Sequence, residues 1–244
     1  MIPLISIVNL INFIIPGILS IRIYKIYKTN KSNLLFYFAS ACFFFSFYWL
    51  MGGLSGIIFN DLNIIGSLHI LRFVFLYLAL FFIIKIPLGL VEQKFLNFVF
   101  PYILIIGGIS FISVGFWNFF PATVLITSPY IYWIPILPHW IEIMTGIFIF
   151  LVLSIFIITF VRLAWKDWSN IAVVRRSIFI IAGMGIIMIG GTLRFLTGGF
   201  FAFYFTYMLS TMSVSVGLLV IADGILYEHR HTVGNNIPDI KNES

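Results

Sequence analysis

The chain has 244 residues, of which 61% are hydrophobic and only 9% are charged, and its mean hydropathy is +1.12. A soluble domain carries roughly 25% charged residues, so this composition excludes a water-soluble globular protein. The net charge of +6 and the pI near 9.5 would suggest nucleic-acid binding in a soluble domain, but basic residues spread along a membrane surface face anionic lipid headgroups instead. The predicted partner is therefore the lipid bilayer, and no nucleic acid is expected.

Seven apolar runs are each long enough to cross a bilayer as a helix. A transmembrane helix needs about 20 apolar residues, whereas a barrel strand needs about 9–11 residues of alternating character. The runs are continuous, so the predicted fold class is all-α, a polytopic bundle of seven transmembrane helices. In chain order the predicted spans are residues 4–24, 34–59, 64–86, 95–117, 140–163, 177–196 and 201–227.

Basic residues lie on alternate connections between these spans, which is the pattern of the positive-inside rule. The opposite connections, residues 60–63, 118–139 and 197–200, contain no lysine or arginine. With an odd number of spans, this pattern predicts an outside N-terminus and a cytoplasmic C-terminus in a multi-pass protein of the cell membrane. The basic residues at the predicted cytoplasmic ends are Arg22, Lys25, Lys28, Lys31, Lys85, Lys94, Arg162, Lys166, Arg175, Arg176, Arg230 and Lys241.

The chain is predicted to divide into a transmembrane domain, residues 1–227, and a short cytoplasmic tail, residues 228–244. The tail is polar and contains Gly234, Asn235 and Pro238, a composition typical of a disordered segment. Cys42 is the only cysteine, so no intramolecular disulfide can form.

Ionisable residues within the spans indicate candidate functional sites, because each costs roughly 2.5–3.5 kcal/mol at the bilayer centre on insertion scales. Five of them are predicted to share one depth near the outer surface and to form a ligand-binding site. The pairs His69 with Arg72 and His139 with Glu142 are each spaced i,i+3, which places both members on one helix face. The fifth of these residues is Arg194. The two arginines outnumber the one glutamate, so the site would suit an anionic or carboxylate-bearing ligand.

Three other interpretations of this polar layer stay open at the sequence level. The arginines could extend to the outer headgroups while Glu142 pairs with one of them. His69, His139 and Glu142 also match the ligand set of a catalytic zinc site, although adjacent arginines would repel a cation. The two histidines could instead ligate a haem. No further motif supports either group, so neither a metal nor a cofactor is predicted.

The segment of residues 118–139 is rich in proline and aromatic residues and cannot be a continuous helix. It is predicted to lie in the interface as an aromatic belt or to cover the polar layer as a lid, since connections beyond about 12–15 residues are usually functional or disordered. Glycines of the sixth span and hydroxyl residues of the seventh favour close helix packing. Near the cytoplasmic end, Asp223 is predicted to form a structural ion pair with Arg162, Arg175 or Arg176.

Family-level features narrow the functional interpretation. Residues 201–227 contain no lysine, which excludes a covalently bound retinal. Three features carry a resemblance to a known family. They are the sequence Phe47-Tyr48-Trp49 before residues 54–59, the aromatic outer segment, and an inward seventh span ending at Tyr227-Glu228. In these features the chain resembles the seven-helix N-terminal membrane sensor region of bacterial histidine kinases.

Such sensor regions are normally followed by a cytoplasmic signalling domain, whereas this sequence ends at Ser244. The resemblance therefore implies a receptor that signals through a separate partner. The expected function is the binding or sensing of a small ligand at a polar pocket open to the outer face. A transporter or channel component is the first alternative, and a membrane-embedded enzyme using Glu142 or His139 as acid or base is the second, although no catalytic residue is predicted.

Overall fold

A computed structural model describes residues 2–59, 61–90, 94–117, 123–127, 130–134, 139–196 and 203–234. In this part of the chain, seven helices are long and apolar enough to cross a membrane, which confirms the predicted helical, multi-pass architecture. The helices are α1 (Leu4–Asn30), α2 (Asn33–Ile58), α3 (Leu62–Leu90), α4 (Lys94–Trp117), α5 (His139–Lys166), α6 (Ile171–Leu196) and α7 (Phe203–Gly234).

The last helix is longer than the predicted seventh span. α7 continues to Gly234, beyond the expected domain boundary at Tyr227. Residues 235–244, which make up the remainder of the predicted disordered tail, lie outside the described residues.

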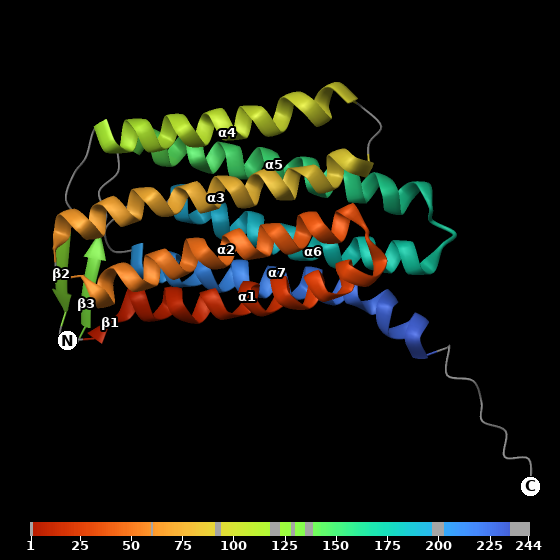
Figure 1. Ribbon diagram of the computed structural model, residues 1–244, viewed down its shortest axis with the longest axis horizontal. Helices are drawn as coiled ribbons and strands as arrows, with labels where there is room; N and C mark the ends of the chain where they lie inside the picture. Colours follow the sequence, from red (N-terminus) through yellow and green to blue (C-terminus); the bar gives the residue numbers. More distant parts are fainter. Residues whose placement is uncertain are drawn as a thin grey trace, which may run out of the picture.

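Six helices form a closed ring, and α4 packs outside it. Around the ring α1 contacts α2, α2 contacts α3, α3 contacts α5, α5 contacts α6, α6 contacts α7, and α7 returns to α1. α4 packs mainly on α3 and touches α5 at few points (Figure 1). The ring therefore has an interior, into which side chains from several helices project.

The outward-facing surface of the helices is apolar. Ile106 on α4 and Ile11 on α1 are more than half exposed, as are apolar residues on α5, α6 and α7. Contiguous apolar surface on this scale is typical of contact with lipid chains rather than with water.

Glycines bring α6 and α7 into the close packing that their sequence predicts. A β-carbon added at Gly183 would lie 2.6 Å from the carbonyl oxygen of Gly217, and one at Gly190 would lie 2.5 Å from Cβ of Ser213. Small residues allow helix backbones to approach in this way within a membrane. Gly185 differs, because a β-carbon there would meet nothing within 4 Å.

A small three-stranded sheet lies at the end of the bundle where α1 and α3 begin (Figure 1). β2 (Thr123–Thr127) pairs antiparallel with β3 (Tyr130–Ile134), and β3 pairs parallel with β1 (Ile2–Pro3). The two hairpin strands belong to the segment that was predicted to be a belt or a lid, and the sheet itself was not predicted. We call this end of the bundle the sheet end.

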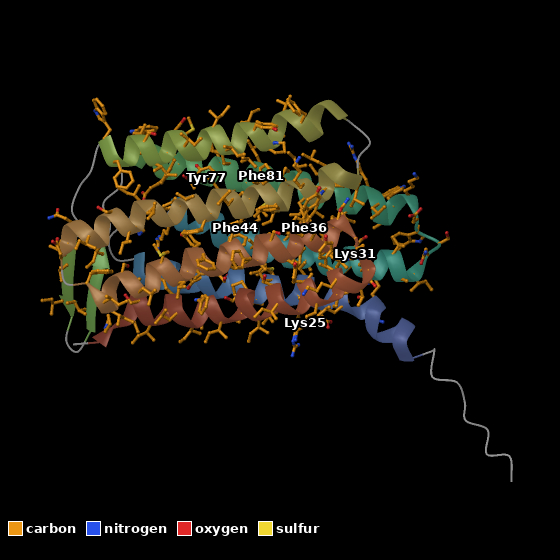
Figure 2. The ribbon with its side chains drawn as sticks, in the orientation of Figure 1. Lys25, Lys31, Phe36, Phe44, Tyr77 and Phe81 are labelled. Atoms are coloured by element: carbon orange, nitrogen blue, oxygen red, sulfur yellow. The ribbon has the colours of Figure 1, made fainter. Side chains whose placement is uncertain are left out.

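Lysines and tyrosines gather toward the opposite end of α1, and Figure 2 labels Lys25 and Lys31 there. α1 ends at Asn30, and the next residue, Lys31, has a φ of 53° and donates its backbone N–H to the carbonyl of Tyr27 over 2.8 Å. The ammonium groups of Lys28 and Lys31 lie 5.5 and 5.7 Å from the ring centres of Tyr24 and Tyr27. Lysines beside aromatic rings are typical of a membrane interface.

Candidate functional site

Arg72 is enclosed within the helix bundle at the sheet end. Its position on α3 is about 15 Å along the helix axis from Leu62 at the usual rise per residue. Only 2% of its surface is exposed. The interpretation in which Arg72 extends to the outer headgroups is therefore wrong, because its side chain faces neighbouring helices instead.

The guanidinium group of Arg72 is held by contacts from α2 and α3. Its Cζ atom lies 4.9 Å from the ring centre of Tyr48 and 5.7 Å from that of Phe73, both within cation–π range. Nη2 is 3.4 Å from Nε2 of His69, and since a guanidinium group can only donate, the histidine nitrogen is the acceptor. The i,i+3 spacing thus brings His69 and Arg72 together as expected.

Gly52 of α2 provides the space for this arginine. A β-carbon at position 52 would collide with Nη1 of Arg72 and would lie 2.9 Å from Nδ2 of Asn9. The arginine and the asparagine therefore meet over the backbone of α2. Trp49 lies three residues before Gly52 and therefore on the same face of α2. We call Asn9, Trp49, His69 and Arg72 the Arg72 cluster.

The Arg72 cluster has more hydrogen-bond donors than described acceptors. Among the described side chains Arg72 forms no ion pair, and its Nε–H has no hydrogen-bond partner. The indole N–H of Trp49, also 2% exposed, has no partner in the same part of the structure. Leaving a buried donor unsatisfied costs about 1–3 kcal/mol, and more when the group is charged. The arrangement is suited to an acceptor-rich, negatively charged group.

α1 contributes polar residues that were not predicted as site residues. Ser6, Asn9 and Asn12 are all buried. Ser215 Oγ of α7 donates to Oδ1 of Asn12, whose Nδ2 donates to the carbonyl of Val8 over 2.9 Å. These residues carry no charge and so escaped a search for ionisable groups. Their spacing of three residues, which repeats on one face of an otherwise apolar helix, is the signal that could have found them.

Glu142 and its neighbours on α5 meet a different face of α3. Glu142 is half-buried in the first turn of α5. About one turn further along α5, the hydroxyl of Thr145 lies 3.3 Å from the hydroxyl of Tyr77. Tyr77 is five residues beyond Arg72, a rotation of about 140° around the helix. Arg72 therefore points away from the α5 contact, and Glu142 is not among its described contacts.

The other predicted site residues are placed only in part. His139 and Arg194 lie on α5 and α6, but their side chains fall outside the described residues. Convergence of the five predicted ligand-binding residues therefore stays a prediction, as do the zinc and haem alternatives that need His139. Within the described residues no group of three or more His, Cys, Asp or Glu side chains could hold a metal ion.

The predicted cytoplasmic residues lie at the opposite end of the bundle. Asp223, Arg162 and Arg175 are exposed, and Arg176 is half-buried. The ion pair expected of Asp223 stays a prediction.

Among the described residues, two cavities lie in succession along the ring interior. The one nearer the sheet end has a volume of about 40 Å³ and is lined by Tyr48, Trp49, Ser210 and apolar side chains of α3, α5, α6 and α7. The second, of about 30 Å³, is lined by Arg176 and apolar side chains of α2, α3, α5, α6 and α7. Along α6 and α7, the buried Met184 and Leu218 lie between the residues that line the two cavities.

No protein-family model, curated protein or solved structure matches this chain. The resemblance to the sensor region of histidine kinases stays a prediction, carried by the residues quoted for it. What the described side chains offer chemically is an enclosed guanidinium group, a neighbouring indole donor and an adjoining apolar cavity.

Proposed function

We propose that this membrane protein binds a small anionic ligand at the Arg72 cluster and transmits the bound state to a signalling partner. The observation that carries the proposal is the burial of Arg72 without a described carboxylate and with its Nε–H unsatisfied. Arginine presents a planar fork of donors that matches a carboxylate or phosphate in two parallel hydrogen bonds. An anion at this position would supply both the missing charge and the missing acceptors.

The orientation predicted from the basic residues places the Arg72 cluster in the outer half of the membrane. Lys28 and Lys31 lie at the opposite end, which the positive-inside rule assigns to the cytoplasm. The cluster is closed off in this conformation, because Arg72 and Trp49 are both buried. Ligand entry from the outside then requires movement at the sheet end, where β2 and β3 lie.

α7 provides a route from the Arg72 cluster to the cytoplasm. The hydrogen bond between Ser215 and Asn12 ties α7 to the helix that carries Asn9. α7 has 32 residues, a length of about 48 Å, and it ends at the predicted cytoplasmic side. A ligand that rearranges α1 would therefore also shift the position of α7. A two-state sensor needs contacts of this kind, which differ between its two conformations.

Anion-dependent thermal unfolding of the purified protein tests this function. Sodium acetate, benzoate and phosphate are compared with sodium chloride at constant ionic strength, so that surface screening is the same in every sample. A ligand present at about 100 times its dissociation constant should stabilise the protein by about 2.7 kcal/mol. Arg72→Gln should abolish the stabilisation, and Arg162→Gln, at an exposed arginine of the opposite end, should preserve it. If no anion stabilises the protein in an Arg72-dependent manner, the proposal is wrong.

Transport is the second candidate, favoured by the succession of two cavities inside one ring. The buried apolar residues Met184 and Leu218 lie between them along α6 and α7. Uptake of a radiolabelled anion into proteoliposomes distinguishes the two functions. Arg72-dependent uptake would indicate a transporter, whereas binding without uptake supports a sensor.

A further inference from the structure

Tyr48 connects the Arg72 cluster to the neighbouring cavity. Its ring lies against the guanidinium group, with Cζ of Arg72 4.9 Å from the ring centre, and the same side chain lines the cavity. Trp49 also lines the cavity, and its ring packs edge to face on that of Tyr48 with the centres 4.9 Å apart. The buried cation and the cavity therefore share one wall, the ring of Tyr48, against which Trp49 packs.

The cavity has the character of an apolar binding pocket. Apart from Tyr48, Trp49 and Ser210, its lining consists of aliphatic residues, one phenylalanine and one glycine. Apolar cavities of this kind hold small apolar molecules in preference to water. Its volume of about 40 Å³, well below the roughly 150 Å³ of a cavity that binds benzene, leaves room for a short hydrocarbon chain but not for a ring.

Building on the proposed function, we propose that the ligand is a small amphiphilic monocarboxylate. Its carboxylate binds the guanidinium group of Arg72 and the indole N–H of Trp49, and its short apolar chain occupies the cavity beside Tyr48. A phosphate or a small inorganic anion would use the donors but leave the apolar pocket unused. A dicarboxylate would place a second charge against aliphatic side chains, which carries a large desolvation cost. A neutral hydrocarbon would leave the Nε–H of Arg72 unsatisfied.

A series of straight-chain carboxylates tests the proposed chemical class on the full chain in detergent. Apparent dissociation constants are measured by thermal unfolding titrations with acetate, propionate, butyrate, valerate and hexanoate, with butanol and succinate as controls. Burial of each added methylene should tighten binding about fourfold until the cavity is filled. Butanol and succinate should both bind at least about tenfold more weakly than butyrate, since each lacks half of the proposed recognition.

Two variants at the cavity wall should move the preferred chain length in opposite directions. Val214→Ile fills part of the cavity and should shorten the preferred chain, whereas Ile149→Val enlarges it and should lengthen the preferred chain. Ile225→Leu, at the second cavity, is the matched control and should leave the preference unchanged. Testing both directions keeps the experiment decisive if one variant folds poorly.

The outcomes separate this inference from the function on which it rests. Arg72-dependent anion binding with no effect of chain length, or with no response to either cavity variant, would overturn the amphiphilic ligand and leave the anion-binding function standing. If no carboxylate or phosphate binds in an Arg72-dependent manner, both proposals fail.

Discussion

Gly52 and Arg72 meet so closely across the α2–α3 interface that a β-carbon on Gly52 could not coexist with the guanidinium group in its present position. The absence of a side chain at one residue thus determines where the charge of the other can lie. With Gly52 in place, the guanidinium group packs inward against Tyr48 rather than extending to the membrane surface. A glycine near the end of an apolar helix is therefore part of the candidate site.

Gly52→Ala should impair anion binding more than it impairs folding. The atom that blocks the new β-carbon is the far end of a flexible side chain, so Arg72 can shift, at an overpacking cost of about 1–3 kcal/mol. The shifted guanidinium group would lose its present contact geometry, and anion affinity should fall at least about tenfold. Thermal unfolding and anion titration measure the two effects separately. Gly185→Ala, where a β-carbon meets nothing within 4 Å, should change neither.

Arg72→Met should raise the thermal stability of the ligand-free protein. The cation–π contacts with Tyr48 and Phe73 contribute about 2 kcal/mol when desolvated, but an unpaired buried charge costs several kcal/mol. The desolvation cost is the larger effect, so a neutral side chain of similar length should stabilise the protein by about 1–3 kcal/mol. A clear loss of stability would mean that Arg72 holds the helices together rather than waiting for a ligand. The anion-dependent stabilisation should disappear in the same variant.

The spans could be predicted from sequence because the thickness of the bilayer dictates how long an apolar run must be. Arg72 and His69 could be singled out because a charge or an imidazole in such a run is costly. Which helices surround Arg72 could not be predicted in the same way. A helix that is apolar on every side shows no single buried face, so nothing in α1 alone indicates that Asn9 lies beside Arg72 over the backbone of Gly52.

The sheet shows a similar limit for contacts that are distant along the chain. The hairpin strands could have been predicted, since the β-branched and aromatic residues of 123–127 and 130–134 flank Ser128-Pro129, a pair typical of turns. The third strand could not, because Ile2 pairs with Tyr130 and no local pattern links residues so far apart. Likewise, the sequence does not determine whether Arg72 extends to the headgroups or is buried, because the outcome depends on how the helices pack.

Cysteine labelling in intact cells tests the predicted orientation. Cys42 is buried and is the only native cysteine, so an introduced cysteine is the only accessible thiol. With a membrane-impermeant maleimide, Asp61→Cys should be labelled from outside, whereas Lys28→Cys and Arg175→Cys should be labelled only after the membrane is permeabilised. All three positions are exposed. External labelling of Lys28→Cys would reverse the orientation and place the Arg72 cluster in the cytoplasmic half.

Asn12 and Ser215 should be energetically coupled, because their hydrogen bond joins α1 to α7. Hydrogen bonds between transmembrane helices contribute about 0.6 kcal/mol on average and up to about 1.7 kcal/mol. In a double-mutant cycle with Asn12→Leu and Ser215→Ala, the coupling energy measured by unfolding should fall within this range.

Ser213→Ala provides the matched control, since the hydroxyl of Ser213 donates to the carbonyl of Leu209 in its own helix over 2.7 Å. Asn12→Leu and Ser213→Ala should be additive within about 0.3–0.5 kcal/mol. Equal additivity in both cycles would remove the proposed link between the Arg72 cluster and α7, and with it the route by which ligand binding reaches the cytoplasmic end.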